Sequence, residues 1–350
     1  MQELIFHVGT PKTGSSALQV FFARNHAVLR SRGIDYFRIG DFSLGTTGNI
    51  SSGNGSLVSR SLLPAGNPIG ITDPEPHIKA LFTAIDASDC DRGLVSSEIF
   101  ADAEPAVLES LIEQIRLKGI TPKAFFYVRR QDQFLSSAYM QQVKRHQCVE
   151  YPEVYIRKIY RQVKYLRYHT FYRNMVILFG AGNVMVRVYE KALTHRAGLF
   201  TAFLGAMGVE ETGFDLDVSD INTSLTTKNL LMMLLLNKYK PRMNFSDFAV
   251  DNEIISGSMR SGVQHHLFSD TLRAEIDAYF RDENAALAKE YFSRADLFDP
   301  TELTGNAHSI SRLSLSTEDA VGFLGGILVR MDGRVAALEA QLKALKNSQS

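Results

Sequence analysis

The chain has 350 residues, of which 45% are hydrophobic and 22% charged. These proportions are typical of a globular protein, and they exclude a disordered, collagen-like or low-complexity chain. The 38 lysines and arginines balance the 38 aspartates and glutamates, so the formal net charge is zero. A neutral chain is poorly suited to coating nucleic acid, and we expect no nucleic-acid partner.

The two cysteines, Cys90 and Cys148, allow at most one disulfide and no cysteine-based zinc cluster. The longest apolar runs, 230–236 and 322–329, fall far short of the roughly 20 residues that span a bilayer. The N-terminal residues lack the basic and apolar regions of a signal peptide. These features predict a cytoplasmic protein with free thiols and no transmembrane segment.

Short apolar runs alternate with stretches of helical periodicity along the chain. The predicted strands are 4–8, 93–97, 124–128 and 183–188. The predicted helices begin at Ser15 and continue with 75–87, 104–118, 131–145, 152–172, 199–207, 225–239 and 271–292. This alternation predicts an α/β fold with a parallel β-sheet flanked by helices.

Residues 38–76 are rich in glycine, serine, asparagine, threonine and proline. A polar loop of this length is uncommon in a compact domain and is often functional. The composition predicts either a lid over a ligand or an insertion without a role.

Between the first strand and the first helix lies a short loop with the chemistry of a phosphate cradle. It consists of Pro11, Lys12, Thr13, Gly14, Ser15 and Ser16. Gly14 lets the backbone approach a ligand, Lys12 brings a charge, and the helix that follows presents N–H groups and a positive dipole end. The lysine precedes the glycine, unlike in the nucleotidase pattern G-x-x-x-x-G-K-[ST]. The alternative is an ordinary turn that happens to contain a lysine.

A second anion site is predicted after the strand 124–128. Arg129 follows this strand, and Ser137 lies eight residues further on in the next predicted helix. An arginine fork and a serine hydroxyl at this spacing can converge on one anion. Arg130 is expected to point the other way along the strand. The alternative for Arg129 is a surface salt bridge.

These two loops resemble those of the sulfotransferases that use 3′-phosphoadenosine 5′-phosphosulfate (PAPS). Residues Pro11–Ser16 fit the family's P-K-[ST]-G-[ST]-[ST] loop at every position, and Arg129 and Ser137 match its contacts to the 3′-phosphate. The resemblance extends over about residues 1–300, strongly at the two loops and weakly elsewhere. It implies a P-loop-like sulfotransferase fold, PAPS as the sulfuryl donor and no metal requirement. Arg260 resembles a third phosphate contact, although Ser261 stands where relatives carry lysine.

The resemblance also implies the catalytic residues. Lys12 is placed to meet the charge that grows on the leaving phosphate. Glu98, at the end of the strand 93–97, lies where the family carries a histidine or glutamate base. Glu98 as a helix cap or as an ion-pair partner of an arginine is the alternative, and the other candidate bases are His77, His146, His265 and His266. His7 is expected to be structural.

The sequence gives few indications of the acceptor substrate. Residues 123–173 hold 11 lysines and arginines against three acidic residues, with tyrosines interleaved. This segment predicts a groove for an anionic or carbohydrate acceptor, with a solvated helix face as the alternative.

Seven apolar residues near the C-terminus recur at spacings of four and three, from Leu324 to Leu345. This pattern predicts a coiled coil of about three heptads and a homo-oligomer. A single amphipathic helix packed on its own domain is the alternative. We therefore expect a sulfotransferase domain at 1–305 and a linker with an oligomerisation helix at 310–350.

The resulting prediction is a PAPS-dependent sulfotransferase that acts on a carbohydrate or another hydroxylated small molecule. Two alternatives stay open. One is a Mg²⁺-dependent nucleotide phosphotransferase of the kinase type, although no apolar strand ends in the aspartate that would hold the metal. The other is a catalytically silent protein that binds 3′-phosphoadenosine 5′-phosphate (PAP) and oligomerises.

Overall fold

The computed structural model describes residues 1–46, 52–193, 198–216, 227–239, 267–299 and 316–348. The chain forms two compact units. Unit 1 comprises Met1–Phe134, Val163–Asn222 and Asp277–Leu303, and unit 2 comprises Leu135–Gln162, Thr223–Ile276 and Thr304–Ser350. The expected domain boundaries, 1–305 and 310–350, stay a prediction.

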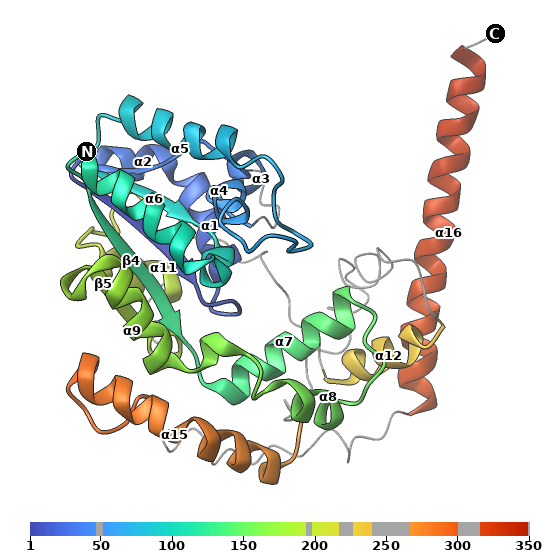
Figure 1. The fold of residues 1–350 in the computed structure, drawn as a ribbon. Coiled ribbons are helices and arrows are strands. Elements are labelled where there is room, and N and C mark those ends of the chain that lie inside the picture. The colour runs from blue at the N-terminus through green and yellow to red at the C-terminus, as the bar shows by residue number, and fades with distance from the viewer. Residues whose placement is uncertain (47–51, 194–197, 217–226, 240–266, 300–315, 349–350) are drawn as a thin grey trace. The chain divides into compact units, whose positions relative to one another are not determined.

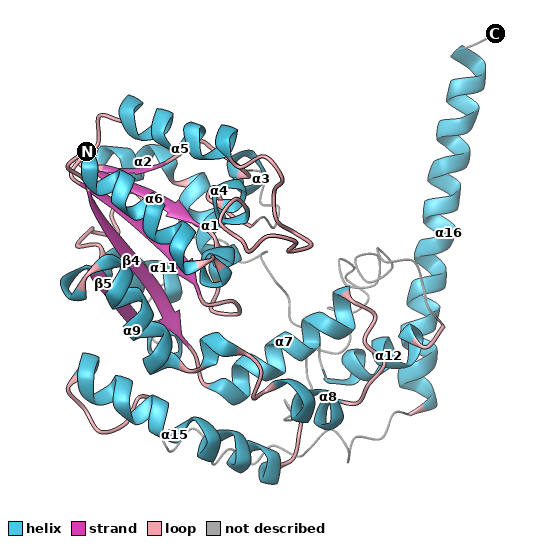
Figure 2. Ribbon diagram, in the orientation of Figure 1, coloured by secondary structure: helices cyan, strands magenta, loops and turns pink. Residues whose placement is uncertain are grey.

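Unit 1 is built on a five-stranded sheet in which every neighbouring pair is parallel (Figure 2). In spatial order the strands are β2 (Ile34–Tyr36), β3 (Arg92–Ser96), β1 (Glu3–Gly9), β4 (Thr121–Val128) and β5 (Val184–Val188). The predicted class, a parallel sheet flanked by helices with a further helix at the C-terminus, is confirmed (Figure 1). Since β1 lies between β3 and β4, the loops that follow these three strands begin side by side.

The strand β2 has no counterpart among the predicted strands. It has only three residues, and its middle residue is the buried Asp35. The Asp35 carboxylate is paired with Arg30 and accepts a hydrogen bond from the Ser88 hydroxyl at 2.7 Å. A charged residue in the centre of a short strand removes the apolar run by which strands are recognised.

Helices cover both faces of the sheet in unit 1. On one face, α1 (Ser15–Arg24) and α11 (Gly198–Ala206) pack through the aromatic rings of Phe22, Phe125 and Phe203. On the other face, α6 (Pro105–Leu117) and α9 (Tyr168–Phe179) contact β4. These layers bury the sheet and leave the ends of its strands for chemistry.

Further elements lie in the described residues of the two units. In unit 1 they are α2 (His26–Ser31), α3 (Phe42–Thr46), α4 (Ser56–Arg60), α5 (Glu75–Ala87), η1 (Glu98–Asp102), η2 (Lys164–Leu166), η3 (Ala181–Asn183) and α10 (Tyr189–Ala192). Unit 2 contains α8 (Pro152–Ile159), α12 (Thr227–Asn237) and α16 (Thr317–Ser348), whereas α7 (Gln131–Arg145) and α15 (Asp270–Phe292) belong partly to each unit. Among the described helices, none has the length and apolar character needed to cross a bilayer.

The single helix predicted at 152–172 is wrong. The chain forms α8, the short turn η2 and α9 instead, and it leaves the helical conformation at Val163 and Arg167. The boundary between the two units falls at this break, after Gln162. Two amphipathic segments on either side of the break produce one continuous helical pattern in the sequence, because periodicity alone does not show which unit buries each apolar face.

The polar segment 38–76 is not one long loop, since its described residues include α3 and α4. Asn54 within it is fully buried. Its amide nitrogen donates to the carbonyls of Phe37 and Leu94 at 3.0 and 3.1 Å, and its oxygen accepts from the Ser96 N–H at 2.8 Å. The polar composition therefore reflects buried hydrogen bonds that anchor this part of the segment to β3. A role as a lid stays a prediction.

Candidate active site

Three neighbouring strands deliver the candidate catalytic and binding residues. The loop Pro11–Ser16 follows β1, Glu98 follows β3, and Arg129 follows β4. All three strands are parallel, so their carboxyl ends share one edge of the sheet, where ligands bind in open α/β folds. The structure brings these predicted residues together.

The loop after β1 is tied down by its own hydroxyl groups. Thr10 donates from its hydroxyl to the Tyr127 carbonyl at 3.0 Å, and the buried Thr13 donates to the Thr10 carbonyl at 2.6 Å. Lys12 has a positive φ of 64°, which is uncommon for a residue with a side chain. The Thr13 hydroxyl is thus used within the loop, and the turn that presents Lys12 is held by β4.

Gly14 is the N-cap of α1 and has a φ of 79°. A Cβ atom at this position would lie 2.3 Å from Leu199 Cδ2 and 3.3 Å from Tyr189 Cε2. Glycine is favoured here, because a residue with a side chain is strained at this φ and its Cβ would displace the Leu199 methyl group. The N–H groups of the first turn of α1 follow directly, and they have no partners within the helix.

Glu98 is the first residue of η1 and is half-buried beside the loop. The Ser15 hydroxyl donates to Glu98 Oε2 at 2.7 Å. A Cβ atom on Gly9, whose φ is 88°, would lie 3.0 Å from Glu98 Cα, so the backbones of β1 and η1 approach closely. Ser15, predicted as a phosphate contact, orients the candidate base.

Arg129 is linked to the same loop from the other side. Its Nη1 donates to the Lys12 carbonyl at 2.6 Å, and its guanidinium lies 5.0 Å from the centre of the Tyr189 ring. The Nε atom is buried and makes no hydrogen bond within the described part of the chain. A buried, unpaired donor on a cation is costly unless a ligand satisfies it, which is the property expected of an anion-binding arginine.

Arg130 has a structural role, in keeping with its expected orientation away from the site. Its Nε forms an ion pair with Asp132 at 3.3 Å, and its Nη1 donates to the Asp299 carbonyl at 3.3 Å. Its guanidinium also lies near the Phe298 ring. Arg130 is thus buried among its own partners.

The remaining predicted site residues have fewer described contacts with the site. Pro11 and Ser16 are half-buried in the loop and at the start of α1. Ser137 is half-buried on the part of α7 that belongs to unit 2, so its approach to Arg129 stays a prediction. Arg260 lies outside the described residues, as do His265 and His266. Among the remaining alternative bases, His77 lies on α5 and His146 follows α7.

Two tyrosines complete the surroundings of Arg129 and were not predicted. The buried Tyr168 hydroxyl accepts from the Arg129 N–H at 3.3 Å and donates to the Arg129 carbonyl at 2.6 Å. Tyr189 borders both Gly14 and the Arg129 guanidinium. Tyr189 is the first residue after β5, so its place at a strand end is the one signal that could have identified it.

His7 lies beneath the loop and is fully buried on β1. Its Nδ1 is 2.8 Å from the Ser96 hydroxyl, which also accepts from the Gln19 amide at 3.3 Å. Burial lowers the pKa of His7 to about 4, so the ring is neutral at physiological pH. This placement fits the expected structural role.

His7 is expected to make stability depend on pH. Well above pH 6.5 the ring is neutral in both folded and unfolded chains. As the pH falls below 6.5, the unfolded chain gains a proton that the folded chain takes up only near pH 4, so stability is lost in this window. The pKa difference corresponds to a loss of about 2 kcal/mol between pH 7 and pH 5. Urea unfolding of the wild type and of His7→Gln at pH 7 and pH 5 measures this loss of stability. An equal pH dependence of stability in the two proteins would contradict the prediction.

The basic segment predicted to bind the acceptor is largely paired with acidic side chains. Arg157 bonds to Glu153 and Glu275 in unit 2, at 3.1 and 2.6 Å, and Arg173 bonds to Glu290 in unit 1 at 2.9 Å. Of the interleaved tyrosines, Tyr160 and Tyr168 are buried. These contacts favour a solvated face with aromatic residues in the core.

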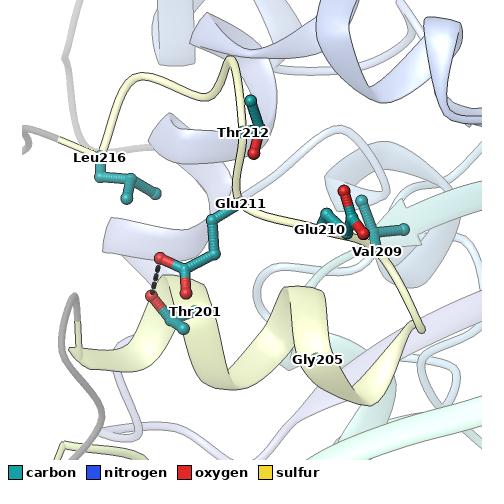
Figure 3. A pocket seen from close by; sticks show the side chains of 7 residues that line it. All are labelled: Thr201, Gly205, Val209, Glu210, Glu211, Thr212 and Leu216. Atoms are coloured by element: carbon teal, nitrogen blue, oxygen red, sulfur yellow. Dashed lines mark hydrogen bonds between the residues drawn. The ribbon is translucent and has the colours of Figure 1, made fainter.

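Unit 1 also has an open hollow (Figure 3). It is bordered by α11 and the residues that follow, and within it the Thr201 hydroxyl donates to Glu211 Oε2 at 3.3 Å. None of the candidate catalytic or binding residues lines it. The lining residues are Thr201, Gly205, Val209, Glu210, Glu211, Thr212 and Leu216. The described residues contain no group of three side chains that could hold a metal ion.

Comparison with known proteins finds weak similarities. No family model matches the chain. An uncharacterized protein of Archaeoglobus fulgidus is 26% identical over 207 residues, which are 59% of this chain and 55% of the relative, so the chain spans little more than half of that protein. A crystal structure of a sulfotransferase from Alicyclobacillus acidocaldarius is 14% identical, with a TM-score of 0.49 over 87% of this chain and all of the other. These similarities leave the function to be inferred from the chain's own residues.

Proposed function

We propose that this protein is a sulfotransferase that takes the sulfuryl group of PAPS and transfers it to a hydroxyl or amine of a small acceptor. The observation that carries the proposal is the meeting of Lys12, Glu98 and Arg129 at the ends of three adjacent parallel strands. A carbohydrate or another hydroxylated metabolite is the proposed acceptor, and this choice depends on the sequence resemblance alone.

The residues present suit a donor with two separate anionic groups. The glycine-capped start of α1 and Lys12 would hold the 5′-phosphosulfate, since helix N-termini bind such anions. Arg129, with a buried and unpaired Nε, would hold the 3′-phosphate, together with Ser137 and Arg260. The described residues of the site supply cations and hydroxyls for this task, and we propose that no metal takes part.

PAPS supplies a sulfur atom that is activated by its bond to phosphate. In the proposed reaction the acceptor oxygen or nitrogen forms a bond to this sulfur while the bond from sulfur to the bridging oxygen breaks. Glu98 accepts the proton of the acceptor, and the Ser15 hydroxyl keeps the carboxylate in place. Lys12 neutralises the charge that develops on the leaving phosphate.

The experiment that tests the proposal is calorimetric titration of PAP into the full chain without added metal. AMP is the matched control, because it differs from PAP only in the 3′-phosphate. We expect PAP to bind much more tightly than AMP. Equal affinities, or binding of ATP only with Mg²⁺, would contradict the proposal and favour the kinase-like alternative. PAP binding without sulfuryl transfer to any screened acceptor would favour the alternative of a catalytically silent PAP-binding protein.

Arg129→Ala is expected to weaken PAP binding by about 1.5–3 kcal/mol, because a charge-assisted hydrogen bond is lost. Binding of AMP to the same variant should not change. A similar loss for both nucleotides would mean that Arg129 acts by supporting the Lys12 carbonyl. Wild-type affinity for PAP would exclude Arg129 as a ligand.

A further inference from the structure

The C-terminal helix α16, coloured red in Figure 1, changes character along its length. Its first part contacts α12 in unit 2, with Phe323 and Ile327 buried. From Met331 to Leu345 every described side chain is exposed. The second part of α16 therefore receives little support from burial within the chain.

The exposed side chains include an apolar seam that runs along one side of α16. Its members are between 48 and 65% exposed. They are Leu324, Leu328, Met331, Val335, Leu338, Leu342 and Leu345. Most helical stability in proteins comes from packing of an amphipathic face, which the exposed part of α16 lacks within the chain, and Gly333 lowers its helix propensity further. Exposed apolar surface on such a helix indicates an association surface.

We infer that a second copy of this chain covers the seam, as a parallel two-stranded coiled coil over residues 324–345. In heptad terms Leu328, Val335 and Leu342 occupy a positions, and the other four seam residues occupy d positions. Leucine at d and a β-branched residue at a favour two parallel strands over three or four. The three leucines at d and Val335 at the central a position follow this rule, whereas Leu328 and Leu342 at a do not bear on the number of strands.

The charges beside the seam agree with this arrangement. Arg334 is at position g, and Glu339 is at position e of the following heptad. In a parallel pair, position g of one helix faces the next e of the other, so two attractive Arg334–Glu339 pairs form across the dimer. In an antiparallel pair, g faces g and e faces e, and these two residues do not face each other. This complementarity supports a second copy of the chain as the partner and a parallel orientation of the two helices.

The first experiment measures the mass of the full chain in solution. Sedimentation at micromolar concentration is expected to show a dimer. Leu338→Glu should raise the dissociation constant by about 100-fold or more, because two leucines leave the interface. Ala337→Glu, one position away and outside the seam, is the matched control and should leave the dimer intact. A monomeric wild type, a trimer or tetramer, or a dimer that survives Leu338→Glu would overturn the inference.

The second experiment tests the orientation by exchanging charges. Arg334→Glu and Glu339→Arg should each weaken the dimer, and the double variant should restore it, because each pair regains opposite charges. Lys343→Glu is the control and should leave the dimer intact. It places a like charge four residues from Glu339 within one helix, but it does not alter the helix faces that are in contact. A double variant without rescue would contradict the parallel arrangement. These outcomes are independent of PAP binding, which tests the proposed function.

Discussion

Lys12→Ala is expected to lower the rate of sulfuryl transfer by about 10²–10³-fold, with a much smaller change in PAP affinity. The reason lies in where the lysine is held. Arg129 bonds to the Lys12 carbonyl, and Thr13 and Thr10 tie the loop to β4, so the loop keeps its anchors when the lysine side chain is removed. The ammonium group is needed most when charge develops on the leaving phosphate, which is an interaction of the transition state.

Single-turnover kinetics at saturating PAPS, together with calorimetry of PAP, separate the two effects for Lys12. Lys79→Ala on the exposed face of α5 is the matched control and should leave both quantities unchanged. Equal losses in transfer rate and PAP binding would mean that Lys12 binds the ground state and the transition state equally strongly. A wild-type rate would remove Lys12 from the proposed mechanism.

The meeting of the three strand ends could be predicted because its causes are local. Each strand is an apolar run that ends at a polar residue, and alternation with helices makes the strands parallel. Parallel strands carry their carboxyl ends to one edge, so the sequence alone indicates that Lys12, Glu98 and Arg129 lie near one another. The position of the loop could be predicted because glycine and serine after an apolar run mark the start of a helix. Its role in binding phosphate stays a prediction.

The contacts that hold the site could not be predicted, because they join residues distant in sequence. Tyr168 is 39 residues from Arg129, and Asn54 is 42 residues from Ser96. Nothing in the local pattern distinguishes a tyrosine that bonds to a strand end from one that packs in the core. The break between α8 and α9 at Gln162 could not be predicted either. An amphipathic pattern does not indicate which of the two units buries the apolar face.

Glu98→Gln is expected to lower the transfer rate by about 10²–10⁴-fold, the usual contribution of a general base. The fold and PAP affinity should be retained, because the glutamine oxygen can still accept the Ser15 hydroxyl in place of Oε2. Glu104→Gln, six residues further along and before α6, is the matched control and should transfer at the wild-type rate.

A second variant distinguishes the base from a merely structural carboxylate. Ser15→Ala removes the hydrogen bond to Glu98 but leaves the carboxylate, so its loss should be much smaller than that of Glu98→Gln. The pH profile of kcat/KM gives the decisive readout, since loss of the base should remove the acidic limb of the profile in Glu98→Gln but not in Ser15→Ala. An acidic limb that persists in Glu98→Gln would assign the proton to another group, and His77 and His146 would then be tested first.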